Sequence, residues 1–263
     1  MTKPIVIAVM LAIAFCVKGY PPAYGQQIAT LGEAINVAGR QRMLTQRMIK
    51  AYSEVGMDEV YSFHDAHAHL SEAVSLFDRQ LRQLDDFAYD GVTRQRLRDV
   101  RSLWVQFAPV VGAPPTKARA IPLNTLGERL LASAHSVVLS LQDISDAEIA
   151  EIVNISGRQR MLSQRLAKFY AIEAWGLERT EISEERQRAF SEFESAMSRL
   201  QSTSLNTQET LELLKKADVQ WRFFRDRLEK SREESTTMLV AITSEKLLDL
   251  FNQLTGAYAV IEQ

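Results

Sequence analysis

The sequence predicts an all-α protein built from two tandem up-down four-helix bundles, and three observations carry that prediction. Only 11 glycines and 7 prolines occur in 263 residues, and apolar residues recur at spacings of three and four, as in helices that bury one face. A nine-residue segment occurs twice: residues 39–47 read GRQRMLTQR and residues 157–165 read GRQRMLSQR. Asn36 and Asn154 stand at the same distance ahead of the two copies, so the chain consists of two copies of one unit.

Residues 1–25 have the features of a secretory signal peptide. Lys3 is the only early charge, and the apolar stretch 5–17 is too short to span a membrane. Small residues at the −3 and −1 positions, Ala23 and Gly25, predict cleavage before Gln26. Retention of this segment as an uncleaved anchor is the alternative, whereas the large Phe15 before Cys16 argues against a lipoprotein.

The composition of the mature chain excludes several classes of protein. Cys16 is the only cysteine, so after cleavage no disulfide, thiolate metal site or cysteine nucleophile remains. The mature chain has 29 basic and 33 acidic residues, which argues against nucleic-acid binding. No later segment is apolar enough to span a bilayer, and we expect a periplasmic protein. No catalytic triad order, glycine-rich phosphate loop or zinc pattern occurs, so we expect neither an enzyme nor a cofactor.

In the first unit, residues 26–144, the sequence predicts four helices. Glycine and proline mark the breaks, with a turn at 89–91 and one clear loop running from Pro109 to Pro122. The apolar spacing predicts helices over about 27–55, 58–86 and 92–109, and a fourth that starts near Leu123.

The second unit, residues 145–263, repeats this plan. Its predicted helices cover about 145–175, 181–203, 206–230 and 232–261. Phe77 corresponds to Phe193 and Trp104 to Trp221, so we expect the two cores to be built alike, with Trp175 also in the core. No helix breaker precedes the second motif, so the fourth helix can continue into the fifth as one rod of about 50 residues, which would place the bundles end to end.

The motif predicts a helix that is covered on two sides and carries an arginine in an apolar position. One seam has the spacing of helix packing in both copies: Leu31, Ile35, Ala38, Arg42, Thr45, Ile49 and Ile149, Val153, Ser156, Arg160, Ser163, Ala167. A second seam lies on another side: Val37, Leu44, Met48, Ala51, Val55. An unpaired buried charge costs several kcal/mol, so Arg42 and Arg160 need a counter-ion or an exit to solvent.

Small or hydroxylic neighbours leave room beside both guanidinium groups, and a planar five-donor fork in a small pocket suits a planar oxyanion. The two units differ at most other positions, yet arginine, glutamine and glycine recur in the motif, which apolar packing alone would not require. We therefore predict anion binding; the alternative is that each arginine reaches solvent or pairs with a carboxylate of the next helix. The other motif arginines are expected to be solvated or ion-paired: Arg40, Arg47, Arg158, Arg165.

The pattern Asn-x-x-Gly-Arg-Gln-Arg-Met-Leu-(Ser/Thr)-Gln-Arg resembles the signature of the PilJ-type sensor domain, the N-terminal region of type IV pilus chemotaxis transducers. It is also similar to the periplasmic sensor domain of the nitrate/nitrite sensor histidine kinases. In those kinases an arginine on the first helix of a four-helix bundle holds nitrate at a dimer interface, and by position it matches Arg42 and Arg160. The present motif departs from the kinase version by the extra charge of Arg40 and Arg158.

The resemblance implies a sensor that binds a small anion such as nitrate or nitrite and passes the signal to a membrane or periplasmic partner. One chain could present both motif helices, or each copy could meet its twin in a homodimer; end-to-end bundles would favour the homodimer. The candidate ligand-binding residues are Arg42, Arg160, Gly39, Gly157, Thr45, Ser163, Asn36 and Asn154.

Two other functions stay open on the sequence. The first is a structural or adaptor protein whose arginines form interhelical ion pairs. The second is a metal or haem carrier that uses the histidines near the start of the second helix, His64, His67 and His69, although the second unit lacks them.

Overall fold

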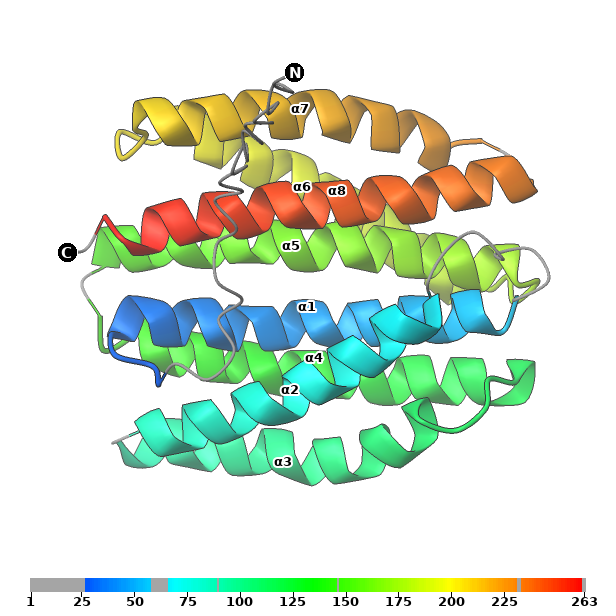
Figure 1. The fold of residues 1–263 in the computed structure, drawn as a ribbon, viewed down its shortest axis with the longest axis horizontal. Coiled ribbons are helices and arrows are strands. Elements are labelled where there is room, and N and C mark those ends of the chain that lie inside the picture. The colour runs from blue at the N-terminus through cyan, green and yellow to red at the C-terminus, as the bar shows by residue number, and fades with distance from the viewer. Residues whose placement is uncertain (1–26, 58–65, 89, 146, 231–232, 262–263) are drawn as a thin grey trace, which may run out of the picture.

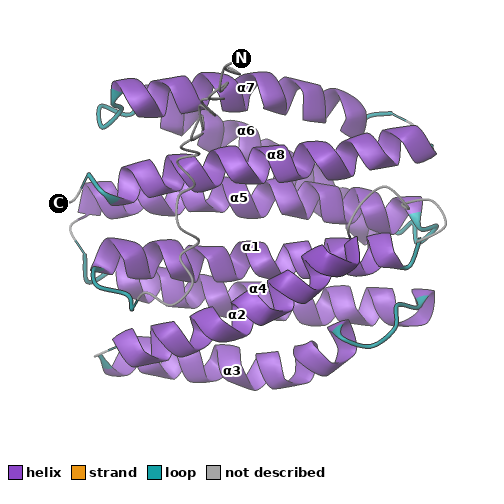
Figure 2. Cartoon of the chain, in the orientation of Figure 1, coloured by secondary structure: helices purple, strands orange, loops and turns teal. Residues whose placement is uncertain are grey.

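The computed structural model describes residues 27–57, 66–88, 90–145, 147–230 and 233–261, and these ranges contain eight α-helices and no strand (Figures 1 and 2). The predicted signal peptide, residues 1–25, lies outside them. No helix in the described ranges combines the length and the apolarity that membrane crossing requires. The helices are α1 (Leu31–Val55), α2 (Ala66–Phe87), α3 (Gly91–Val111), α4 (Lys117–Gln142), α5 (Ala147–Ala174), α6 (Thr180–Ser202), α7 (Gln208–Leu228) and α8 (Glu234–Ala259).

The all-α prediction with tandem helical bundles is confirmed. Helices α1–α4 form one bundle and α5–α8 the other, and each has the same aromatic core. Phe77 stacks on Trp104 with ring centroids 4.2 Å apart, and Phe193 stacks on Trp221 at 3.9 Å. Trp175 is also buried, as predicted. The corresponding aromatic residues therefore pack in the same way in the two units.

The prediction that the fourth and fifth helices form one continuous rod is wrong. Helix α4 ends at Gln142, and α5 begins at Ala147 after a short connection, so that the chain turns back. As a result, the bundles lie side by side instead of end to end, with α1 and α5 in contact and running in the same direction (Figure 1). A rod would have left one face of each motif helix in solvent. The turn buries both faces, and burial of apolar surface outweighs the few lost helical hydrogen bonds.

The loop predicted from Pro109 to Pro122 is too long. Helix α3 continues through Pro109 to Val111, and α4 already begins at Lys117 and contains Pro122. A proline inside a helix removes one backbone hydrogen bond, but both prolines lie near helix ends, where fewer bonds are at stake. Val111 and Ala120 are fully buried, so the added helical turns contribute core contacts.

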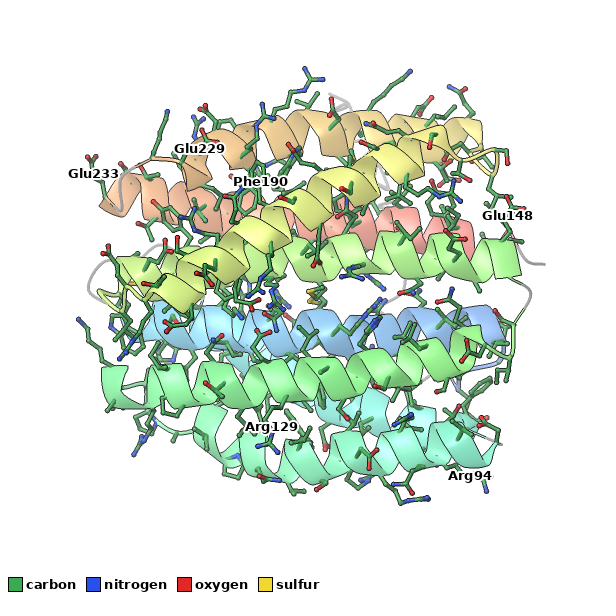
Figure 3. All side chains as sticks on the ribbon, turned by 180° about the vertical axis from the view of Figure 1, so that it is seen from behind. Arg94, Arg129, Glu148, Phe190, Glu229 and Glu233 are labelled. Atoms are coloured by element: carbon green, nitrogen blue, oxygen red, sulfur yellow. The ribbon has the colours of Figure 1, made fainter. Side chains whose placement is uncertain are left out.

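Helices α1 and α5 form the centre of the molecule. In α1 every residue from Gln41 to Val55 is buried, because α2 and α4 cover it within its own bundle and α5 and α8 cover it from the other. Seen from behind, α4 and α6 lie in front of the α1–α5 pair (Figure 3). A motif helix that is covered on more than one side is what the two seams predict.

Candidate functional site

The two motif arginines are buried at the boundary between the bundles. Arg42 in α1 is 1 % exposed and Arg160 in α5 is 0 % exposed, which makes them the largest fully buried side chains of the described chain. Each reaches across the boundary to the other motif helix: Arg42 Nη2 donates to the Asn154 carbonyl at 3.4 Å, and Arg160 Nη2 donates to the Asn36 carbonyl at 3.2 Å. Because α1 and α5 are parallel, the two motifs meet at the same level.

Both guanidinium groups converge on the two motif glycines. A Cβ atom added to Gly39 would lie 3.3 Å from Arg160 Nη2 and 3.4 Å from Arg42 Nη2. A Cβ atom added to Gly157 would lie 3.0 Å and 3.6 Å from the same two atoms. The missing side chains of the two glycines therefore provide the space in which two like charges lie side by side.

The fourth helix of each bundle adds one neutral acceptor to its arginine. In α4, His135 Nδ1 lies 3.1 Å from Arg42 Nη1. In α8, the corresponding Asn252 accepts from Arg160 Nη1 at 3.3 Å, and Asn36 Oδ1 accepts from the same atom at 2.8 Å. The two half-sites thus follow one plan and differ mainly in the histidine.

No carboxylate neutralises either arginine: among the described residues, neither forms an ion pair, and the Nε atom of each has no hydrogen-bond partner. Burial, and then the charge of Arg158, lower the pKa of Arg42 to about 9, so it is still charged at neutral pH. Burial lowers the pKa of Arg160 well below its usual range, with smaller contributions from Arg40 and Arg42. Two desolvated cations without a counter-charge form a strong local attraction for an anion.

Burial and nearby cations also act on His135. Its pKa falls to about 4 through burial first, then through Arg42 and Arg158, while Glu192 opposes the shift. The imidazole is therefore neutral at pH 7, and its Nδ1 can accept the hydrogen bond from Arg42.

The remaining predicted site residues lie in the same region with different contacts. Thr45 and Ser163 are fully buried, but their hydroxyls donate to the helix carbonyls of Gln41 and Arg160. The Asn154 side chain donates to Gln142 Oε1, and its own Oδ1 has no partner. A contact between these groups and a ligand stays a prediction.

Two charged clusters lie directly beyond Arg42 and Arg160, and they were not predicted from the sequence. In one, Glu245 of α8 accepts from Lys50 Nζ at 2.5 Å and from Arg47 Nη2 at 2.8 Å, both on α1. In the other, Glu128 of α4 accepts from Lys168 Nζ at 2.6 Å and pairs with Arg165 Nη1 at 2.9 Å, both on α5.

Each of these carboxylates belongs to one bundle and its cations to the other. Lys50 and Lys168 share the motif offset, and Glu128 and Glu245 stand one residue off it, so a comparison of the units beyond the nine-residue segment would have found them. The prediction that Arg47 and Arg165 are solvated or ion-paired is confirmed, because both form ion pairs.

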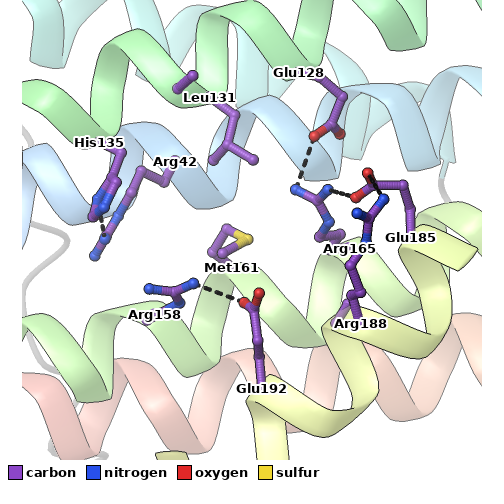
Figure 4. Close-up of a pocket in the computed structure, with 12 residues that line it drawn as sticks. Arg42, Glu128, Leu131, His135, Arg158, Met161, Arg165, Glu185, Arg188 and Glu192 are labelled. Carbon is purple, nitrogen blue, oxygen red and sulfur yellow. Dashed lines mark hydrogen bonds and ion pairs between the residues drawn. The ribbon is translucent and has the colours of Figure 1, made fainter.

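A pocket of about 350 Å³ opens beside Arg42, between α1, α4, α5 and α6 (Figure 4). Arg42 and His135 lie at one end, Glu128, Arg165 and Glu185 lie at the other, and Leu131 and Met161 lie between them. The carboxylates of the lining are all ion-paired with arginine or lysine: Glu128, Glu185, Glu192. Arg42 is the cation in the lining that has no carboxylate partner.

The histidine cluster receives no support as a metal site from the described part of the chain. His64 lies outside it, His67 is exposed at the start of α2, and His69 is partly exposed. No group of three or more His, Cys, Asp or Glu residues in the described ranges has an arrangement that could hold a metal ion.

Comparison with known proteins gives one match, found twice. The family of type IV pili methyl-accepting chemotaxis transducer N-terminal domains (PilJ) matches residues 26–125 and 145–244, which together make up more than half of the chain. A search of curated proteins and a search of solved structures found no match. The two matched segments contain both motifs and the whole of α1 and α5, which carry Arg42 and Arg160. The chain therefore belongs to the PilJ N-terminal domain family, of which it carries two copies, and has the character of a signalling sensor module.

Proposed function

We propose that this protein is an exported, non-enzymatic sensor that binds a small oxyanion, with nitrate or nitrite favoured, between Arg42 and Arg160. One observation carries the proposal: two fully buried guanidinium groups converge on Gly39 and Gly157 without a carboxylate. A planar anion between them would receive hydrogen bonds from two forks at once and would compensate both charges. The kinase resemblance of the motif supports nitrate and nitrite as the first anions to test.

The pairing of the two motifs within one chain supports a single site per chain. Arg42 bonds to the backbone of α5 and Arg160 to the backbone of α1, so each half-site is completed by the other unit. Both arginines are thus available in a monomer, and the site requires no second copy of the chain. A homodimer built through another surface is compatible with this proposal but is not needed for it.

The binding of an anion at this boundary would act on the relative placement of the bundles. Without an anion, the two cations repel each other across the α1–α5 contact, and with an anion they are drawn together. We expect the resulting shift between α1 and α5 to be the signal that a membrane or periplasmic partner reads. Export through the signal peptide, residues 1–25, would place the sensor in the compartment where such a partner presents its sensory domain.

A thermal-melting screen of the purified protein tests the proposal. Nitrate, nitrite, chloride, sulfate and acetate would be compared at equal ionic strength. An anion at 100 times its dissociation constant should add about 2.7 kcal/mol of stability, which is roughly 5–10 °C for a chain of this size. The double variant Arg42→Met with Arg160→Met keeps the volume of the side chains and should lose the response entirely.

The matched control exchanges two exposed arginines, Arg199→Met with Arg225→Met, whose ion pairs are with partly exposed glutamates at 3.4 Å. These changes should leave the anion response intact. An unchanged response to nitrate in the Arg42/Arg160 double variant would refute the proposal, as would stabilisation that depends only on ionic strength.

The adaptor alternative makes an opposite prediction. It requires a carboxylate facing both Arg42 and Arg160, and the described residues place none within ion-pairing distance of either. Under that alternative no anion would stabilise the protein in the screen.

A further inference from the structure

The pocket beside Arg42 is much larger than the oxyanion site needs. Its volume of about 350 Å³ is at the lower end of the range of small-molecule sites, roughly 300–1,000 Å³. Nitrate has four heavy atoms and would leave most of this space empty. Along α5 the lining runs from Arg158 to Arg165, which is about 10 Å at the helical rise per residue.

The chemistry of the lining is divided along that length. One end holds Arg42, which is 1 % exposed and whose hydrogen-bond partners are a neutral imidazole and one carbonyl oxygen. Between the ends, Leu131 and Met161 form an apolar middle, with the Arg158–Glu192 ion pair beside Met161 (Figure 4). Ala132 and Ala189 also line the pocket. The far end is already neutralised, because Glu128 and Glu185 share Arg165, and Arg188 also pairs with Glu185.

These properties specify the ligand. A cationic group has no free carboxylate to meet, since each glutamate of the lining is engaged. An anionic group meets Arg42, for which a charged acceptor is stronger than the neutral His135 nitrogen at 3.1 Å. The apolar middle accommodates hydrocarbon directly next to that anionic group. The lining therefore fits a single carboxylate attached to a short apolar body.

We propose that this pocket binds an organic monocarboxylate, with its carboxylate on Arg42 and its hydrocarbon part against Leu131 and Met161. The inference rests on the proposed function in one respect, namely that Arg42 is an anion-binding group. It adds a second class of ligand, which enters from the α4–α6 side and uses one arginine instead of two.

The test compares acids of increasing length on the purified protein by calorimetry and thermal melting. Formate, acetate, propionate, butyrate and benzoate would be measured beside nitrate at equal ionic strength. Affinity should rise about three- to fourfold with each added CH₂ group that becomes buried. The same affinity for formate and butyrate would overturn the proposal.

A pocket-filling variant separates this site from the oxyanion site. Ala132 lines the pocket and is exposed, so Ala132→Phe adds a ring to the lining without disturbing the core. It should weaken benzoate and butyrate binding at least tenfold and leave the response to nitrate unchanged. Ala118→Phe, at an exposed position of the same helix outside the pocket, is the matched control and should change neither.

Failure of this inference is distinguishable from failure of the proposed function. If only nitrate or nitrite stabilises the protein, or if Ala132→Phe leaves the binding of the longer acids intact, the pocket proposal is overturned and the oxyanion proposal stands. If butyrate and benzoate bind and Ala132→Phe removes them while nitrate has no effect, the pocket proposal stands alone.

Discussion

Lys168 of α5 donates from Nζ to Glu128 Oε1 of α4 at 2.6 Å, across the boundary between the two bundles. Lys168 is fully buried, and its carboxylate partner belongs to the other unit. The pseudo-equivalent contact joins Lys50 of α1 to Glu245 of α8. The boundary therefore has two electrostatic zones: a compensated one at the lysines, and an uncompensated one at Arg42 and Arg160.

Removing one of these carboxylates should destabilise the protein, because it leaves a buried lysine unpaired. For Glu128→Gln we expect a loss of about 2–3 kcal/mol in the free energy of unfolding, less than for a fully buried pair because the carboxylate is partly exposed. Glu245→Gln should cost less, since Lys50 keeps Glu54 at 4.0 Å. Urea unfolding measures both values.

The control for this pair is Glu151→Gln, which breaks an exposed ion pair with Arg199 and should cost less than about 1 kcal/mol. Equal losses for Glu128→Gln and Glu151→Gln would show that the boundary carboxylate does not compensate Lys168.

Gly39→Ala should weaken anion binding strongly with little loss of stability. The new Cβ would lie 3.3 Å from Arg160 Nη2, so that guanidinium group must give way slightly, and 3.4 Å from Arg42 Nη2, so the methyl group would occupy the space beside both groups. We expect at least a tenfold rise in the dissociation constant for nitrate, measured by calorimetry. Gly256→Ala has nothing within 4 Å of its Cβ and should instead stabilise the protein by about 0.5–1 kcal/mol without an effect on binding. Unaltered nitrate affinity in Gly39→Ala would contradict the shared position of the anion.

Replacing both motif arginines should not destabilise the protein. Arg42→Met with Arg160→Met removes two buried cations that have no counter-charge, and such replacements by apolar groups of similar volume are neutral or stabilising by about 1–4 kcal/mol. Urea unfolding in the absence of added anion checks this. A large loss of stability would instead indicate that the arginines serve the fold.

Stability should fall in acid through Glu245. Burial raises the pKa of this carboxyl, but Lys50 and Arg47 outweigh burial and bring it to about 2, below its ordinary 4.5. The folded-state pKa is depressed, so the ion pairs contribute fully above about pH 4.5, and the contribution is lost as the pH falls toward 2. The pKa of Glu128 is shifted in the same direction, although burial opposes the shift from Lys168 and Arg165.

Melting curves of the wild type and of Glu245→Gln between pH 6 and pH 2.5 test this linkage. The difference in melting temperature should be constant above about pH 4.5 and should shrink below it, because protonated Glu245 resembles glutamine. A difference that stays constant down to pH 2.5 would rule out Glu245 as the titrating group.

Much of the fold follows from the sequence because helical signals are local. The aromatic pairs around Phe77 and Phe193, and the repeat offset, specify two similar bundles before any coordinates are known. The placement of the bundles relative to each other depends instead on contacts between residues far apart in the sequence. An end-to-end arrangement leaves one face of each motif helix in solvent, whereas a side-by-side arrangement buries both faces. The four residues after Gln142 contain no proline or glycine, so a continuous helix remained possible on local grounds.

The site was predictable in part for a similar reason. An arginine in an apolar seam is a visible anomaly, and it identified Arg42 and Arg160. His135 and Asn252 contact the arginines from other helices. The sequence around them does not distinguish them, since each is one of many polar residues on its helix. Only the packing of α4 and α8 against the motif helices brings them to the arginines.

The contact between α1 and α5 within one polypeptide has a consequence for how the sensor behaves at low abundance. Two half-sites on separate chains come apart on dilution, whereas tethered half-sites keep a high effective concentration at any expression level. Tethering also allows the two half-sites to differ in sequence, so that one can carry a histidine where the other carries an asparagine. A single chain of this kind can respond asymmetrically in a way that two identical subunits cannot.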